Sequence, residues 1–267
     1  MRKTAQSRGK RTPSNPGAPL GREEIAVSLA AALGPCEQVI AFWEGGAPSY
    51  GRLDEWSDID LYVVVEDDWV DQAFRITEKC LRSLSPIKQK YVVQHPEGSG
   101  IFQAFYRLSR ASEYLMIDLA VLKMSAPGKY LEPEIHGPAL FHFNKENQVR
   151  IPRLDRREHA KKVRAASKRL KERFELFNCF VQKEINRGNT LEAADLYHRV
   201  VYGSLVDALR IKHSPMHHDF RTRYIHYELP RKVTARLQDL CFVGDVRDLQ
   251  RKYDEASEWF REVAKTI

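Results

Sequence analysis

The sequence has no long apolar run. No stretch of its 267 residues approaches the roughly 18–20 consecutive apolar residues that a membrane-spanning helix requires. The N-terminus also lacks the apolar segment of a secretory signal peptide. We therefore expect a cytoplasmic chain that has no membrane partner.

Cysteine is scarce, and the 4 cysteines are scattered along the chain. No C-x-x-C pair is present, which argues against a cysteine zinc site and fits a reducing compartment. Histidines gather in one segment, at His213, His217, His218 and His226. Because they form no helical His-x₃-His pair and have no cysteine partner, a loop with solvated histidines is preferred over a zinc site.

Acidic residues are absent from residues 1–18 and scarce in residues 150–173, although the net charge of the chain is only +7. Residues 1–20 are also rich in Ser, Gly and Pro, which predicts a disordered basic tail. We expect this tail to be solvated, with contact to nucleic acid or an acidic surface as the alternative. Residues 150–173 form either a solvated helical face or a surface that neutralises a triphosphate or a polyanionic acceptor.

Residues 21–152 alternate between helical and extended patterns. Apolar spacing predicts a helix from Arg22 to about Gly34, and a second helix, capped by Asp67 or Asp68, is expected to end near Leu84. Runs of β-branched and aromatic residues predict strands at 36–43, 59–65, 90–94, 101–109 and 114–123, and a small hairpin at 139–151. The expected fold of residues 21–152 is α+β, a single domain with a mixed or antiparallel sheet and flanking helices.

Residues 153–267 carry a different pattern. Apolar residues recur every three or four positions from Val163 to Ile185, which predicts one long amphipathic helix that Gly188 ends. Further helices are expected at 190–212, 230–242 and 245–265. The second half is therefore predicted to be a bundle of four or five helices.

Two carboxylates stand on one predicted strand. Because side chains alternate along a strand, Asp58 and Asp60 share one face, while Ile59 and Leu61 point to the core. Like charges this close repel each other unless a cation lies between them, and Mg²⁺ suits oxygen ligands. A pair of metal ions is the arrangement used for in-line phosphoryl displacement. Taken alone, D-x-D has a structural alternative, because Asp also caps turns at strand edges.

A glycine pair precedes these carboxylates. Gly45 and Gly46 follow the first predicted strand and open a turn, where backbone N–H groups can approach phosphate oxygens closely. A strand, a Gly-Gly turn, a spacer and D-x-D leading into an apolar run form a much more specific pattern than D-x-D alone. The combination favours a nucleotide site.

Residues 45–65, GGAPSYGRLDEWSDIDLYVVV, resemble the defining motif of the DNA polymerase β superfamily of nucleotidyltransferases, in the form found in aminoglycoside and related antibiotic nucleotidyltransferases. The resemblance implies a third carboxylate on a later strand, for which Asp118 is a better match than Glu113. It also implies two Mg²⁺ ions held by Asp58, Asp60 and Asp118. Asp118 would orient or deprotonate an acceptor hydroxyl that attacks the α-phosphate and releases pyrophosphate. The implied nucleotide-binding residues are Gly45, Gly46, Ala47, Ser49, Arg52 and Ser57.

One position departs from the family pattern. Many relatives have Ser after the second glycine, where this chain has Ala47. The hydroxyl of Ser49 could compensate, although Pro48 alters the turn. We expect weaker triphosphate binding, and a catalytically weakened nucleotide-binding regulatory protein is an alternative to an enzyme.

The acceptor is the least defined part of the expected reaction. The preferred function is transfer of AMP from ATP, or of another nucleoside monophosphate from its triphosphate, to a hydroxyl of a small, aminoglycoside-like molecule bound by the helical half. Asp195 and Arg199 lie at helical spacing and are candidates for contact with this acceptor, with an exposed ion pair as the alternative. Transfer to a macromolecule, either an RNA end or a protein hydroxyl, is the other alternative, so nucleic acid is not the favoured partner. No oligomeric state is indicated.

Overall fold

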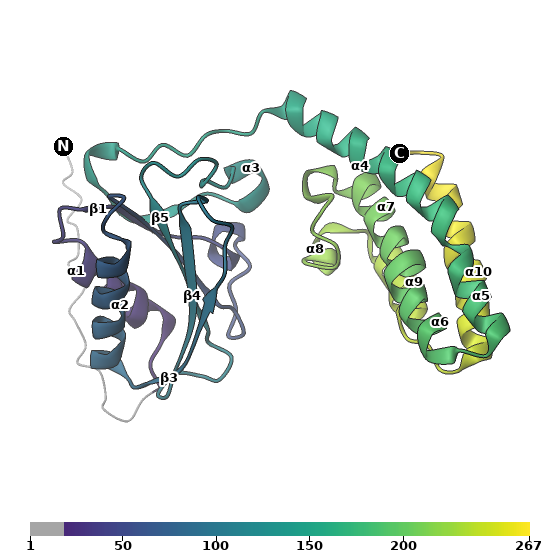
Figure 1. Cartoon of the computed structure of the whole chain (residues 1–267), viewed down its shortest axis with the longest axis horizontal. Coiled ribbons are helices and arrows are strands. Elements are labelled where there is room, and N and C mark those ends of the chain that lie inside the picture. The colour runs from purple at the N-terminus through teal and green to yellow at the C-terminus, as the bar shows by residue number, and fades with distance from the viewer. Residues whose placement is uncertain (1–18) are drawn as a thin grey trace, which may run out of the picture. The chain divides into compact units, whose positions relative to one another are not determined.

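The computed structural model describes residues 19–267, and the predicted basic tail, residues 1–20, lies almost entirely outside them. The chain divides into two compact units, and the boundary in the sequence lies between Arg153 and Leu154 (Figure 1). Each unit is described by itself. The first unit contains a sheet with helices, and the second unit is helical.

Within the described residues, a six-stranded sheet forms the centre of the first unit, with the strand order β3-β4-β5-β2-β1-β6. β2 and β5 run parallel, whereas β1/β2, β1/β6, β3/β4 and β4/β5 are antiparallel pairs. The strands are β1 Val39–Glu44, β2 Ile59–Val65, β3 Ile87–Val93, β4 Ile101–Leu108, β5 Ile117–Lys123 and β6 Leu140–Asn144. The α+β fold with a mixed sheet is confirmed.

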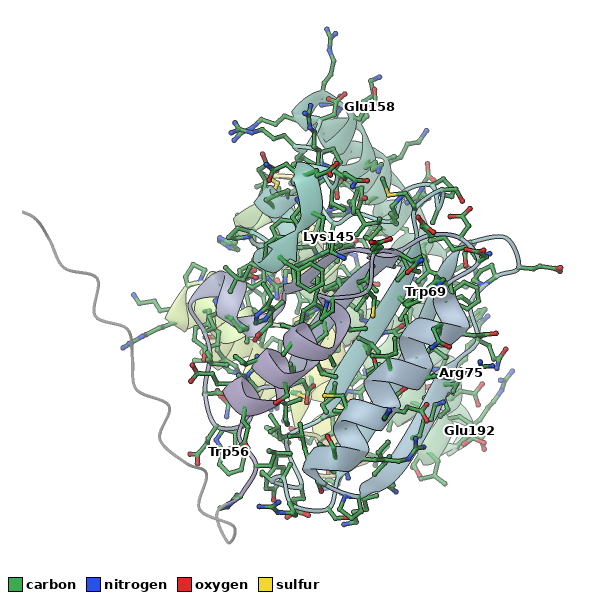
Figure 2. All side chains as sticks on the ribbon, turned by 90° about the vertical axis from the view of Figure 1, so that its left-hand side faces the viewer. Trp56, Trp69, Arg75, Lys145, Glu158 and Glu192 are labelled. Carbon is green, nitrogen blue, oxygen red and sulfur yellow. The ribbon has the colours of Figure 1, made fainter. Side chains whose placement is uncertain are left out.

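Two helices cover one face of this sheet, α1 (Arg22–Leu33) and α2 (Val70–Leu84). Figure 2 looks onto them, with Trp69 at the start of α2 and the exposed Arg75 further along it. Gly34 caps the C-terminus of α1, and α2 ends at Leu84. Both predicted helices are therefore confirmed. Two short elements, η1 (Ala47–Tyr50) and α3 (Pro133–His136), lie in the connections between strands.

The two faces of β2 have different surroundings. Ile59, Leu61, Val63 and Val65 are at most 1% exposed and pack with α1 and α2 in the main core. The opposite face carries a smaller apolar cluster around Trp43, Ala41, Val64 and Ala120, together with the carboxylates. The alternation read from the sequence therefore divides core from site along a single strand.

Residues 139–151 do not form the predicted hairpin. Only Leu140–Asn144 is extended, and it pairs with β1 at the edge of the main sheet as β6, followed by the short turn η2 (Lys145–Asn147). Asn144 closes this turn, since its Nδ2 donates to the Val149 carbonyl at 2.9 Å and its Oδ1 accepts from the Val149 N–H at 3.1 Å. The side chain thus replaces the pairing that a second strand would have supplied.

Asp67 does not cap α2, so the capping prediction is wrong for this residue. Asp67 instead accepts hydrogen bonds from the hydroxyl of Ser125 and from its backbone N–H, the latter at 3.0 Å. Among the described residues, no side chain caps α2. These bonds hold the pKa of Asp67 below its ordinary value. They also join the loop after β2 to the loop after β5.

The second unit is a helical bundle with its own core, in which Phe174 stacks on Phe260 with ring centroids 3.7 Å apart. The described helices include none that is long and apolar enough to cross a membrane. The predicted bundle is confirmed. Its elements are α4 Arg156–Phe177, α5 Cys179–Arg187, α6 Thr190–Leu196, η3 Tyr197–Tyr202, α7 Gly203–His213, η4 Pro215–His217, α8 Ile225–Glu228, α9 Arg231–Cys241 and α10 Val246–Ala264.

Two predicted helices differ in detail from the structure. The long helix that Gly188 ends is divided at Asn178 into α4 and α5. Asn178 Nδ2 donates to the carbonyls of Phe174 at 2.8 Å and Glu175 at 3.2 Å, so the side chain competes for backbone acceptors. The helix predicted at 190–212 is present, but its middle, η3, is a π-helix.

The histidine-containing loop is packed rather than solvated. His217 Nδ1 lies 2.9 Å from Glu228 Oε2, and its ring stacks on Phe220 with centroids 4.4 Å apart. His218 Nδ1 is buried and, in the part of the chain described, has no hydrogen-bond partner. The expected loop is correct, but its two central histidines are structural members of the bundle.

Candidate functional site

Asp60 and Asp118 lie opposite each other on neighbouring strands. The parallel register of β2 and β5 pairs Asp60 with Asp118, so both side chains leave the same face of the sheet. Asp58 precedes β2 and shares this face by alternation, and the Ile59 N–H donates to the Met116 carbonyl at 2.8 Å. The structure therefore places all three predicted carboxylates at one end of one sheet face.

Negative charge accumulates at this sheet end. Burial raises the pKa of Asp58, against a backbone hydrogen bond from Met116 and the positive charges of Arg22 and Arg107. Burial also raises the pKa of Asp118, and the charge of Asp58 raises it further. Asp118 is a largely buried carboxylate whose ionisation the charge of Asp58 opposes, and a cation here would stabilise the ionised form.

Gln103 holds Asp118 from the neighbouring strand β4. Its Nε2 donates to Asp118 Oδ1 at 2.6 Å, and its Oε1 lies 3.1 Å from His95 Nε2. Because Oε1 of the amide can only accept, His95 must carry its proton on Nε2 for this contact to be a hydrogen bond. Gln103 opposes the rise in the Asp118 pKa. Gln103 and His95 were not predicted as site residues from the sequence. The signal that could have pointed to Gln103 is a polar residue within the apolar run IFQAFYRL.

Arg22 connects three elements at the same end of the sheet. Its guanidinium donates to the Glu44 carboxylate at the end of β1 and to the backbone carbonyl of Asp58. Glu44 is only 9% exposed, so this ion pair is shielded from water. Arg22 therefore fixes the backbone that carries Asp58. As the first residue of the predicted helix, it gave no sequence signal for this role.

The glycine turn lies directly against the carboxylates. Gly46 has φ +68° and ψ −139°, and a Cβ atom there would overlap Asp60 Oδ2. The Gly45 N–H donates to the Asp60 carbonyl at 2.9 Å, and a Cβ on Gly45 would lie 3.0 Å from the Tyr62 ring. Only glycine at position 46 permits both this backbone conformation and this approach. The predicted proximity of the turn and the D-x-D motif is thus a direct contact.

The remaining predicted nucleotide-binding residues lie in the loop between Gly46 and β2. Ala47 begins η1, and Ser49 Oγ donates to the Pro138 carbonyl at 2.7 Å, so its proton is already engaged. The Arg52 guanidinium lies 5.1 Å from the centre of the Tyr50 ring. Ser57 Oγ donates to Asp54 Oδ1 at 2.6 Å within the turn that precedes β2. Three of these side chains therefore shape the loop.

Asp195 and Arg199 belong to the helical unit and form an ion pair with each other, four residues apart. Both side chains are more than half exposed. The exposed pair that the spacing allowed as an alternative is therefore present, and contact with an acceptor remains a prediction for these two residues.

Whether the sheet end could hold a metal ion depends on the ligands that the side chains there offer. Within residues 19–267, no three His, Cys, Asp or Glu side chains converge closely enough to hold one ion. The donor chemistry nevertheless fits a divalent cation, because Asp58, Asp60 and Asp118 offer only oxygen ligands. Burial is the main cause of the raised pKa values of Asp58 and Asp118, so a bound cation would offset the cost of ionising them.

No protein-family model matches the chain, and no curated protein matches it. Solved structures do resemble it over most of its length. An aminoglycoside 6-adenyltransferase from Bacillus subtilis is 13% identical, with a TM-score of 0.33 over 92% of this chain and 90% of that chain. A nucleotidyltransferase-like protein from Exiguobacterium sibiricum is 12% identical, with a TM-score of 0.37 over 92% of this chain and 75% of that chain.

A third similar structure is the STING-associated CdnE c-di-GMP synthase from Capnocytophaga granulosa. It is 11% identical, with a TM-score of 0.31 over 92% of this chain and 80% of that chain. With TM-scores below 0.5, none of these likenesses carries an activity over to this chain.

Proposed function

We propose that the chain is a metal-dependent nucleotidyltransferase that transfers AMP from ATP to a hydroxyl group of a small molecule and releases pyrophosphate. One observation carries this proposal: Asp60 and Asp118 stand in register on parallel strands while Gly46 lies against the Asp60 carboxylate. A phosphate-binding turn and a set of oxygen ligands thus meet at one place, as phosphoryl transfer requires.

The turn contributes backbone donors. Gly46 and Ala47 stand at the start of η1, where N–H groups precede the first hydrogen bond of a helical turn. Such N–H groups bind phosphate oxygens whatever the side chain is. The missing hydroxyl at Ala47 therefore weakens triphosphate binding without removing it, and Ser49, engaged with Pro138, adds no free proton.

Asp118 is the proposed base. Gln103 fixes its Oδ1 through a hydrogen bond of 2.6 Å, so that Oδ2 can face an acceptor hydroxyl. The hydroxyl proton passes to Asp118 as the hydroxyl oxygen bonds to the α-phosphorus. The bond from the α-phosphorus to the bridging oxygen breaks at the same time, and pyrophosphate leaves.

Asp58 and Asp60, with Asp118, would hold Mg²⁺ by their carboxylate oxygens. When bound, Mg²⁺ supplies positive charge that offsets the charge of the triphosphate and of the leaving pyrophosphate. Arg22 keeps the Asp58 backbone in place, and Gly46 keeps the turn close to Asp60.

Labelled ATP tests the proposal. The full chain is incubated with labelled ATP, Mg²⁺ and a panel of aminoglycosides, transfer RNA and protein acceptors, and both pyrophosphate and labelled product are measured. We expect transfer to a small hydroxylated acceptor. The Asp58→Asn variant should abolish it, and Asp118→Asn should lower kcat by about 10²–10⁴ because the base is lost.

Asp71→Asn is the matched control, because Asp71 is an exposed acid in the first turn of α2. It should retain full activity, and melting curves should show all three variants to be folded. ATP binding without transfer to any acceptor would identify a nucleotide-binding regulatory protein. Labelling of RNA or protein alone would overturn the small-molecule acceptor, and unchanged activity in Asp58→Asn would overturn the mechanism.

A further inference from the structure

The helical unit contains a groove of about 870 Å³ between α4 and α7. It is named here the α4–α7 groove and is lined on its polar side by Lys162, Arg169, Arg173, Asp207, His218 and Arg221. Its volume lies in the range of roughly 300–1,000 Å³ typical of small-molecule sites. Neither the nucleotide turn nor the D-x-D strand contributes to it.

Positive charge lines one wall of the groove. Lys162, Arg169 and Arg173 follow one another at helical spacing along α4, and Arg221 faces them from the loop before α8. In the described part of the chain these four cations form no ion pair, whereas Lys168 on the same helix pairs with Glu172 at 3.9 Å. The basic segment 150–173 thus directs three of its cations into one cavity.

Asp207 provides an acceptor without a partner. Its Oδ1 is buried and, among residues 19–267, receives no hydrogen bond. Burial raises its pKa, although the charges of Arg221 and Arg173 act in the opposite direction. His218, which also lines the groove, has a buried Nδ1 that receives and donates no hydrogen bond within the described part of the chain. Buried polar atoms of this kind are rarely left unsatisfied unless a ligand or water completes them.

The loop that presents Arg221 is fixed from inside the bundle. Arg221 has φ +52°, a conformation that non-glycine residues seldom adopt. The fully buried Arg210 donates to the backbone carbonyl of Arg221 through Nε at 2.7 Å and also pairs with Glu228. A Cβ on Gly203 would lie 3.3 Å from Arg221 Nη2, so the guanidinium packs close over this glycine. Strain held in place by a buried charge is typical of ligand-binding loops.

Leu170, Phe177 and Ile211 form the apolar part of the lining. We propose that the α4–α7 groove binds a small phosphorylated ligand that carries hydroxyl groups, such as a sugar phosphate. Arg169, Arg173 and Arg221 bind the phosphate, Asp207 Oδ1 accepts from a hydroxyl, and the apolar lining takes the carbon frame. Guanidinium groups suit phosphate because they donate two parallel hydrogen bonds.

Other ligand classes fit the groove less well. A polycation such as an aminoglycoside would face four cations against the two acids Asp207 and Asp219. Single-stranded RNA is usually bound by stacking on several aromatic rings, and Phe177 is the single aromatic side chain in the described lining besides His218. A small polyhydroxylated phosphate uses the cations, the lone acceptor and the short apolar surface together.

Ribose 5-phosphate is a suitable probe for this groove. Calorimetric titration of the full chain should show binding of ribose 5-phosphate, weaker binding of inorganic phosphate, and none of ribose. Arg173→Gln and Arg221→Gln should each weaken the affinity about tenfold or more, because each removes a charge-assisted contact. Asp207→Ala should reduce the preference for ribose 5-phosphate over inorganic phosphate, since it removes the acceptor for the hydroxyl but no phosphate contact.

Lys168→Gln is the charge-matched control on α4 outside the groove, and it should leave the affinity unchanged. Asp58→Asn should also leave it unchanged, so the result is independent of the transfer reaction. The proposal is overturned if ribose 5-phosphate fails to bind the folded chain, or if the two arginine variants bind it normally. Tighter binding of a single-stranded RNA that Arg173→Gln weakens would identify a polyanion surface instead.

Discussion

Individual residues determine the geometry of the sheet site, and Gly46 is the clearest case. Its positive φ and its contact with Asp60 leave no space for any side chain. Asp58, Asp60 and the glycine pair could be predicted from the sequence because their spacing is local. Gln103 left only a weak signal, a polar residue in an apolar strand, and Arg22 left none, because both reach the site through strand pairing and helix packing that join distant parts of the chain.

Gly46→Ala tests the turn. The added methyl group would overlap Asp60 Oδ2 and strain the backbone, which costs on the order of 1–3 kcal/mol. We expect ATP affinity to fall by about tenfold or more and transfer to be lost. Gly128→Ala is the control, because Gly128 also has a positive φ of 57° but has open space around it. Equal effects of the two substitutions on ATP affinity would show that backbone strain alone is responsible.

Asp207→Asn tests a pH dependence. Burial places the pKa of Asp207 in the folded chain above its value in the unfolded chain. The folded state therefore binds this proton more tightly, and ionisation at neutral pH lowers the free energy of unfolding. We expect the variant to melt at a higher temperature than the wild type at pH 7. The difference should vanish below about pH 3, under the unfolded-state pKa of about 3.9, where Asp207 is protonated in both states. A difference independent of pH would contradict this reasoning.

At the scale of elements, local patterns predicted most helices and strands, and side chains that bond to the backbone caused the errors. Asn144 turned the expected hairpin into one edge strand and a turn, and Asn178 divided the expected long helix. Neither effect could be read from periodicity, because apolar spacing records which face is buried and not which backbone groups a side chain occupies.

Asp155 at the start of α4 offers a test at this scale. Its carboxylate accepts from the N–H groups of Arg157 at 2.9 Å and Glu158 at 3.1 Å, so it caps the helix. Asp155→Ala should lower the free energy of unfolding by about 1 kcal/mol, measured by denaturant titration. Asp155→Asn preserves the capping oxygen and should be nearly neutral. A large loss in the Asn variant would mean that the charge, rather than the cap, stabilises α4.

For the whole molecule, the two units have separate cores. The first core is built around β2 and α1, and the second around Phe174 and Phe260. Residues 154–267 should therefore fold when expressed alone, with a helical circular dichroism spectrum and a cooperative thermal transition. Phe174→Ala in this fragment should lower the free energy of unfolding by about 3–5 kcal/mol, since the ring is fully buried. A fragment without a cooperative transition would show that it depends on the first unit.

The parallel pairing of β2 with β5 also constrains the order of events during folding. β1 and β2 are neighbours in sequence and can pair early, but Asp60 meets Asp118 only after α2, β3 and β4 have been made and the crossover has closed. Closing so long a connection is slow compared with forming a hairpin. A chain emerging during synthesis would thus carry the glycine turn and two carboxylates well before it could hold the proposed metal ion, and binding at this site would report that β2 has paired with β5.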